Sequence, residues 1–370
     1  MRNSYLFFLS FCFFFSCSKE DEMATIATPE EINFELIGIN TDAVFQYRHD
    51  GALNSGIETN LTNELGVSTN YLTLRQSGTT ISFYSFSAGK FSLYQKNIET
   101  GEIKNFEDFY TDTSERSIVW GTNNDTSVFF GFYNPQGTTN LAIRNIDLST
   151  LEGTDFSLEF NINTLYPPLY YNGKLFITYK TNTLDYNIAV YNTDAGILEQ
   201  TLSYGTYAPS ILINDDGNLA VFKFSEALRT GLDILDFDTL AKIQEFSPTL
   251  SQQFSPGPIN AKLINTKFYY GFEYSQPFSI ERGPAIYDLS SSTNTIIDLS
   301  GLIREVEIAN DISIYISNQQ YDAKEGVFLV SYGVFGNGNE LRGGAMIISN
   351  EGKLIDTVSL NFLPVYFIEQ

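Results

Sequence analysis

A strand-turn-strand unit that recurs along most of the chain constrains its fold more than any other feature. The unit is clearest over residues 174–204, where runs of β-branched and aromatic residues alternate with polar ones, and Asn, Asp or Gly clusters close the runs. This pattern predicts three consecutive antiparallel strands. One unit cannot bury its own apolar face, so we expect stacked copies to share a core.

The third strand of the unit shows the repeat best. Seven runs match it, at residues 43–48, 91–98, 140–146, 187–191, 231–237, 284–287 and 344–348. The last residues of successive runs are about 45 to 61 positions apart. Turn residues such as Glu99-Thr-Gly101 follow several of these runs and predict a hairpin to a fourth strand. Four-stranded repeats of roughly 40 to 50 residues are typical of β-propeller blades.

The two ends of the repeat array complement each other. The first blade offers three strands, at 32–38, 43–48 and 57–61, whereas a surplus strand at 364–369 follows the last blade. Because an unpaired apolar edge invites aggregation, we expect the C-terminal strand to complete the first blade. The sequence therefore predicts an all-β fold, a seven-bladed β-propeller formed by residues 31–370 as one domain. Six or eight blades are alternatives, since the step from 287 to 348 could contain an insertion.

Composition narrows the class of partners. The chain has 31 Phe and 23 Tyr against one Trp and shows no long helical periodicity, as expected for an all-β protein. Its formal net charge of -23 repels phosphate backbones, so we do not expect nucleic acid as a partner. Cys12 and Cys17, the two cysteines, both precede the predicted domain, which leaves it without a disulfide.

The N-terminus has the organisation of an export signal. Arg2 precedes the apolar run 5–15, which is too short to span a bilayer, so residues 1–16 are predicted to be a signal peptide. Phe14-Phe-Ser-Cys17 resembles a bacterial lipobox, which implies a lipid on Cys17. The acidic residues that follow resemble the export tag of surface lipoproteins in the Bacteroidota group.

This resemblance implies a lipid anchor in the outer membrane, with residues 17–30 as a tether and the propeller facing the cell exterior. A plain secretory signal and a merely solvating acidic segment are the alternatives. Residues 174–222 also resemble the YVTN-type propeller repeat, through Leu175–Asn182, Val190–Thr193 and the turn Asn214–Asn218. That resemblance supports the fold and implies no activity.

Three arginines are the first candidate ligand-binding residues. Arg229, Arg282 and Arg342 each lie close to a glycine in the predicted second-to-third-strand loop of consecutive blades. Loops of this kind emerge on one face of a propeller, so the guanidinium groups would converge on one rim and could bind a carboxylate or another small anionic ligand. Alternatively, each arginine forms an exposed ion pair with a nearby glutamate.

Aromatic residues crowd the connections between blades on the same predicted face. Tyr204 and Tyr207 are the clearest case, and exposed rings of this kind suit sugars, catechols or a partner protein. The alternative is that they fill the wedge between two blades. Phe268–Tyr274 is expected to contribute one side of a strand to the core, as is Trp120.

Catalytic and metal signals are weak. His49, the single histidine, precedes Asp50-Gly51 and is predicted to be a turn residue, and Asn214–Asn218 is expected to be a hairpin turn and not a calcium loop. No cofactor and no metal are predicted. The leading hypothesis is a non-catalytic surface lipoprotein that binds a ligand or docks on an outer-membrane transporter, as an accessory to uptake. A carboxylate-dependent hydrolase or lactonase is the alternative, and a spacer without ligand is a third.

Overall fold

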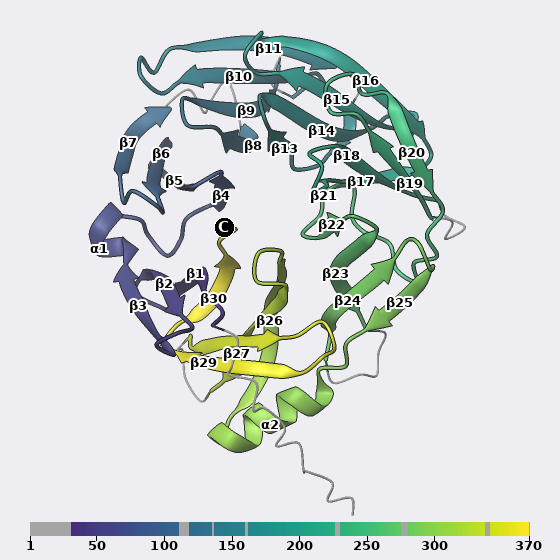
Figure 1. The fold of residues 1–370 in the computed structure, drawn as a ribbon. Helices are drawn as coiled ribbons and strands as arrows, with labels where there is room; N and C mark the ends of the chain where they lie inside the picture. The colour runs from purple at the N-terminus through teal and green to yellow at the C-terminus, as the bar shows by residue number, and fades with distance from the viewer. Residues whose placement is uncertain are drawn as a thin grey trace, which may run out of the picture.

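The computed structural model describes residues 31–110, 118–134, 137–159, 162–225, 230–274, 280–336 and 341–369. Within these residues, seven sheets of mainly antiparallel strands form a ring, which confirms the predicted seven-bladed propeller (Figure 1). The predicted signal peptide, the tether with Cys17, and Arg229 lie outside the described residues.

The first four blades lie in the N-terminal part of the chain, apart from one strand of blade 1. In sheet order, blade 1 contains β3 (Ser55–Asn60), β2 (Val44–Asp50), β1 (Phe34–Ile39) and β30 (Leu363–Phe367). Blade 2 contains β4 (Thr73–Ser77), β5 (Thr80–Ser87), β6 (Lys90–Asn97) and β7 (Ile103–Tyr110). Blade 3 contains β8 (Ile118–Asn123), β9 (Ser127–Tyr133), β10 (Leu141–Asp147) and β11 (Gly153–Glu159). Blade 4 contains β12 (Ile162–Leu165) and β13 (Leu169–Tyr171), which both pair with β14 (Lys174–Thr181), then β15 (Tyr186–Asn192) and β16 (Ile197–Gly205).

The remaining three blades have the same arrangement. Blade 5 contains β17 (Ala208–Ile213), β18 (Leu219–Phe224), β19 (Thr230–Leu235) and β20 (Lys242–Phe246), with β21 (Gly257–Pro258) parallel to β17. Blade 6 contains β22 (Lys262–Ile264), β23 (Lys267–Glu273), β24 (Arg282–Asp288) and β25 (Thr293–Ile296). Blade 7 contains β26 (Ser313–Asp322), β27 (Val327–Phe335), β28 (Gly343–Ile348) and β29 (Leu354–Leu360).

Two helices interrupt the strand pattern. α1 (Leu61–Leu65) links blades 1 and 2; the Asn60 side chain caps its first turn by accepting a hydrogen bond from the Asn63 backbone N–H. α2 (Ser300–Asn310) links blades 6 and 7 and buries Ile303 and Val306 against them. The insertion considered for the long step between residues 287 and 348 is therefore this helix.

The ring closes where strands from the two ends of the described residues meet. β30 pairs antiparallel with β1, with Leu36 opposite Phe367 and Ile39 opposite Leu363. The Phe362 ring stacks on Phe45 of β2 at a centroid distance of 4.9 Å, so aromatic packing reinforces the backbone pairing. The predicted closure of the first blade by the C-terminal strand is confirmed, and it covers the edge of β1.

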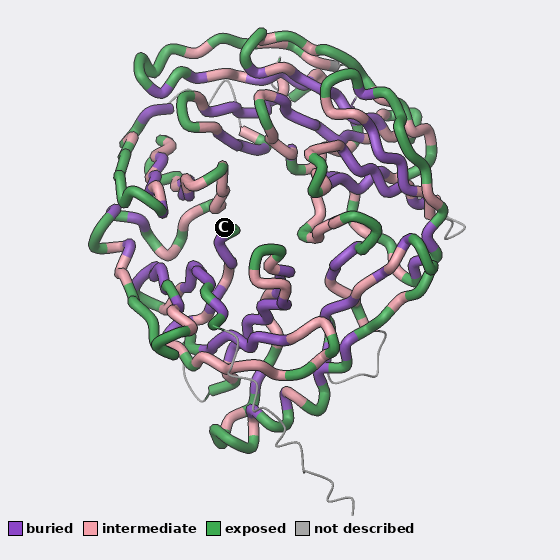
Figure 2. The backbone as a smooth tube through the Cα atoms, in the orientation of Figure 1, coloured by how far each residue is buried: buried purple, intermediate pink, exposed green. Residues whose placement is uncertain are grey.

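Alternation along each strand fills the spaces between blades. In the described residues, seven apolar clusters each join two neighbouring blades, so the middle strands are buried on both faces (Figure 2). In β23, Phe268 and Tyr270 face blade 5, whereas Tyr269 stacks on Tyr321 of blade 7 at 3.6 Å. The sequence predicted that one side of this strand is buried, whereas both sides are buried in the structure. Trp120 lies in the core, as predicted.

Several turns between third and fourth strands are stabilised by the same pattern of side-chain hydrogen bonds. Asn97, Asp147, Asn192 and Asp288 each accept hydrogen bonds from the backbone N–H groups two and three residues later. The Ser149 hydroxyl and neighbouring backbone N–H groups hold the pKa of the Asp147 carboxyl below its usual value. These turns emerge on the same face as the first-to-second-strand turns, which we call the turn face. The second-to-third-strand loops and the connections between blades form the opposite, loop face.

Truncating Phe367 to alanine should lower the free energy of unfolding by about 3 to 5 kcal/mol, because this fully buried ring fills the core at the closure. Phe335, which is 63% exposed, is the matched control, and its truncation should cost less than about 1 kcal/mol. Urea unfolding of both variants measures the difference. Equal losses would show that the closure does not carry this stability.

Candidate functional site

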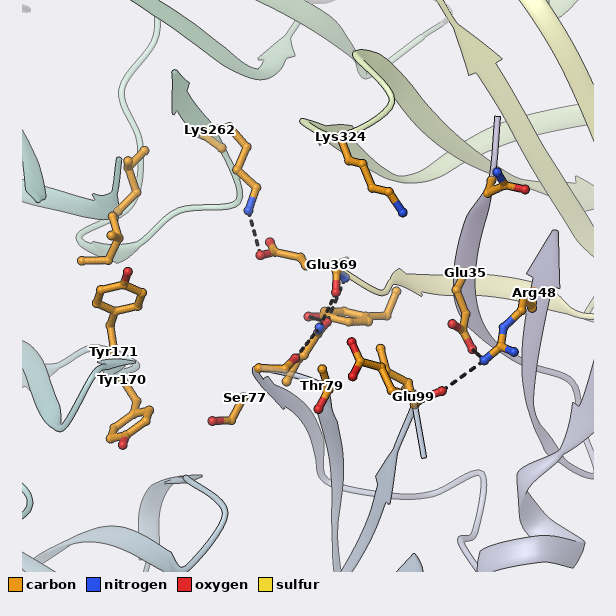
Figure 3. Close-up of a pocket in the computed structure, with 18 of the residues that line it drawn as sticks. Glu35, Arg48, Ser77, Thr79, Glu99, Tyr170, Tyr171, Lys262, Lys324 and Glu369 are labelled. Atoms are coloured by element: carbon orange, nitrogen blue, oxygen red, sulfur yellow. Dashed lines mark hydrogen bonds and ion pairs between the residues drawn. The ribbon is translucent and has the colours of Figure 1, made fainter. Parts of the chain in front are cut away.

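The ring encloses a cavity on the turn face, with a volume of about 1540 Å³. Every blade contributes to its wall, since the lining includes Asp50, Ser77, Asn124, Asn172, Asn214, Lys262 and Lys324. Most of these residues belong to first-to-second-strand and third-to-fourth-strand turns or to the ends of innermost strands. Figure 3 shows charged, hydroxyl and aromatic side chains that point into this space.

On one side of the cavity, a buried carboxylate is held by two groups of β2. The Glu35 side chain is 4% exposed and accepts a hydrogen bond from the Gln46 amide. The Arg48 guanidinium lies 3.5 Å from the same carboxylate and donates to the Ile98 carbonyl oxygen of blade 2 at 3.1 Å. Antiparallel pairing of β1 with β2 places Glu35 opposite Arg48, so the local register of the sheet positions this pair.

Two lysine side chains project into the cavity from the other side. Lys262 on β22 forms a 2.7 Å ion pair with Glu369, which follows the closing strand. Lys324, in the turn between β26 and β27, also projects into the cavity (Figure 3). The cavity wall therefore carries charges of both signs. Glu35, Glu99 and Arg48 come from blades 1 and 2, and the two lysines come from blades 6 and 7.

Two tyrosines of blade 4 give the wall its aromatic part. Tyr170 stacks on Phe129 at a centroid distance of 6.0 Å, and its hydroxyl accepts a hydrogen bond from the Asn124 amide at 3.2 Å. Tyr171 packs edge-on against Phe237 at 5.4 Å. Both rings are half-buried, so the packing fixes their orientation while part of each side chain stays accessible to a ligand.

His49 differs from its predicted role as a turn residue. It lies within β2, is buried, and stacks on Phe34 at a centroid distance of 4.8 Å. Its Nε2 lies 3.9 Å from an Asp356 carboxylate oxygen on β29 of blade 7. Burial lowers the pKa of the imidazole, and the negative charges of Asp356 and Asp50 oppose that shift in part. Side chains two residues apart on a strand point to the same face of the sheet, so His49 lies on the same buried face of β2 as Tyr47.

The predicted tyrosines come together, but away from this cavity. Tyr204 and Tyr207 line a smaller cavity of about 450 Å³ on the loop face, where the Lys223 ammonium lies 2.8 Å from Asp233. Tyr207 is 45% exposed, whereas burial raises the pKa of the Tyr204 hydroxyl. One of the two rings therefore packs between blades and the other is accessible.

The predicted arginines occupy equivalent places on neighbouring blades. Arg282 begins β24, Arg342 directly precedes β28, and both are exposed on the loop face. Neither lines either of the two cavities described above. Arg229 lies outside the described residues and directly precedes Thr230, which lines the smaller cavity.

The residues of the central cavity carry no signal that sequence patterns alone reveal. Glu35, Arg48, Lys262, Lys324 and Glu369 are scattered over the chain, and none belongs to a motif. The one usable signal was the repeat itself, because it identifies the turns that emerge on the turn face. Among the described residues, no group of three or more His, Cys, Asp or Glu side chains is placed to hold a metal ion. No helix in the described ranges is long and apolar enough to cross a membrane.

Solved propeller structures resemble this one. A candidate 6-phosphogluconolactonase from Bacteroides fragilis aligns over 93% of this chain and 99% of its own, with a TM-score of 0.53 and 12% sequence identity. A second, from Bacteroides uniformis, aligns over 91% and 99%, with a TM-score of 0.51 and 13% identity. These likenesses show the fold alone. No protein-family model and no curated protein sequence matches the chain.

The buried state of His49 predicts how stability changes with pH. Because its pKa is lower in the folded than in the unfolded chain, the folded state binds fewer protons below the ordinary value of 6.5. We expect the contribution of the neutral His49 imidazole to the free energy of unfolding to be complete above pH 6.5 and to be lost as the pH falls toward the folded-state pKa.

Titration of the single imidazole resonance by NMR should give a midpoint below 6.5. A His49→Gln variant should lose less urea stability than the wild type between about pH 7.5 and 5.5. A midpoint at or above 6.5 would contradict the prediction.

Proposed function

We propose that this protein is a lipid-anchored surface protein whose propeller binds a hydroxyl-rich ligand, such as a saccharide, in the central cavity without transforming it. The anchor is Cys17, and the propeller serves as an accessory to uptake across the outer membrane. The observation that carries the proposal is the cavity of about 1540 Å³ with polar groups from all seven blades.

The chemistry of the wall supports this class of ligand. Hydroxyl and amide groups of Ser77, Thr79 and Asn172 can donate and accept hydrogen bonds, and the tyrosines of blade 4 offer apolar surface beside them. The cavity is larger than the roughly 300 to 1,000 Å³ typical of sites for drug-sized ligands. A ligand of several sugar units therefore fits this description better than a small metabolite does.

The point at which the chain enters blade 1 supports a role near the membrane. The chain enters blade 1 on the turn face, where Asn33 lines the cavity. The 14 residues of the tether, 17–30, span at most about 50 Å when extended. The tether would thus keep the face on which the cavity opens within about 50 Å of the lipid, which suits transfer of a ligand to a membrane partner.

The enzymatic alternative rests on the carboxylates of the cavity, which include Glu35, Glu99 and Glu369. The likeness to two candidate 6-phosphogluconolactonases concerns the fold alone. Incubation of the protein with gluconolactone and with oligosaccharides tests it. Catalysed turnover that a Glu99→Gln variant loses would favour a hydrolase or lactonase over a binding protein.

Ser77→Trp should place an indole ring in part of the cavity and lower the affinity for saccharides at least about tenfold. Isothermal titration of the full chain in detergent with short neutral and acidic oligosaccharides measures this effect. Ser87→Trp is the control, because Ser87 is exposed in the same blade but lies at the loop-face end of β5.

A double variant, Arg282→Ala with Arg342→Ala, compares the two faces in the same titration. Retained binding is expected from a site in the central cavity. Loss of binding in this variant, with normal binding by Ser77→Trp, would place the site on the loop face as the arginine pattern predicts.

Lipid attachment should depend on Cys17 and not on Cys12. Labelling of cells with a radioactive fatty acid should mark the wild type and Cys12→Ala, whereas Cys17→Ala should stay unlabelled and leave the membrane fraction. Label on Cys17→Ala would contradict the anchor assignment.

A further inference from the structure

One ion pair crosses the ring through the central cavity. Lys262 belongs to the innermost strand of blade 6, whereas Glu369 follows the closing strand of blade 1, and blade 7 lies between these blades. The ion pair therefore joins neither two strands of one sheet nor two neighbouring blades. Its side chains are 28% and 49% exposed, and an exposed pair of this kind stabilises a fold by about 0 to 1 kcal/mol.

The backbone of Glu369 is fixed independently of its carboxylate. The Gln76 amide of blade 2 donates to the Glu369 carbonyl oxygen at 2.7 Å and accepts from the Glu369 N–H at 2.9 Å. The Tyr366 hydroxyl donates to the same Gln76 oxygen at 3.2 Å. Because these hydrogen bonds hold the main chain, the Glu369 side chain can leave Lys262 while the ring stays closed.

Lys262 places a positive charge inside the cavity of a chain whose net charge is -23. The Glu369 carboxylate lies 2.7 Å from this ammonium group and partly neutralises its charge. Lys324 of the adjacent blade 7 also projects into the cavity and is a second cation of its wall (Figure 3). An oxyanion on a ligand would meet the Lys262 ammonium where the Glu369 carboxylate lies.

We propose that Lys262 binds the oxyanion group of a polyhydroxylated ligand, such as a sugar acid, and that Glu369 occupies this position when no ligand is bound. The inference rests on the proposed function and adds the charge of the ligand to it. Glu369 competes with the ligand for Lys262, and Lys262 determines the specificity of the site for acidic ligands.

Titration of the full chain with a galacturonic acid trisaccharide and with the uncharged galactose trisaccharide tests the proposal. Glu369→Gln should raise the affinity for the acidic sugar about three- to fivefold, because the competing carboxylate is removed. Lys262→Met should lower that affinity about tenfold or more. Neither change should alter the affinity for the neutral sugar more than about twofold.

The double variant separates competition from indirect effects. When Lys262 is already replaced, Glu369→Gln should give no gain, since the two residues act at one position. Lys267→Met in the same hairpin and Glu305→Gln on α2 are the matched controls, because both residues are exposed and outside the cavity. Thermal unfolding of each variant confirms that it folds.

The outcomes distinguish the two proposals. Binding of both sugars with equal affinity, unchanged in Lys262→Met, overturns the inference and leaves the proposed function standing. Absence of binding of either sugar to wild type and to Glu369→Gln overturns both. An acidic preference that survives Lys262→Met assigns the oxyanion to another group and overturns the role of Lys262.

Discussion

Pairing of β30 with β1 is the interaction that holds the ring together as a closed structure. A linear array of blades exposes two edges, and each edge presents unpaired backbone groups beside an apolar face. The C-terminal strand supplies the missing innermost strand of blade 1, so the last and first described strands belong to one sheet. The two ends of the array thereby remove each other's exposed edge.

Closure also creates the cavity. Once the ring is sealed, the innermost strands surround an axis that their backbones are too far apart to fill, and the turns at their ends line its mouth. Glu369 lies at this mouth because it follows β30, which is itself an innermost strand. It can therefore meet both Gln76 of blade 2 and Lys262 of blade 6. The same step that completes the fold brings Glu369 into the candidate site.

Burial on both faces of the blades explains the composition of the chain. Each middle strand packs against two neighbouring blades, so residues of both parities along it are apolar, as Phe268, Tyr269 and Tyr270 illustrate. The outermost strands and the turns carry most of the exposed polar residues. The charged groups of the central cavity come from both kinds of position, since Glu99 and Lys324 lie in turns whereas Glu35, Arg48 and Lys262 lie on strands.

The strands, the turns, the number of blades and the closure could all be predicted from local alternation and from one missing and one surplus strand. The period alone also brings Arg282 and Arg342 to one face, because they recur at one position of the blade. The large cavity on the turn face and the burial of His49 emerged only with the assembled ring. Lys262, Lys324 and Glu369 occupy different positions in their blades and gather because the ring turns these positions toward one axis. The reason is physical: local pattern fixes which way a side chain points relative to its own strand, whereas a cavity and the charges around it are set by residues from blades far apart in the chain.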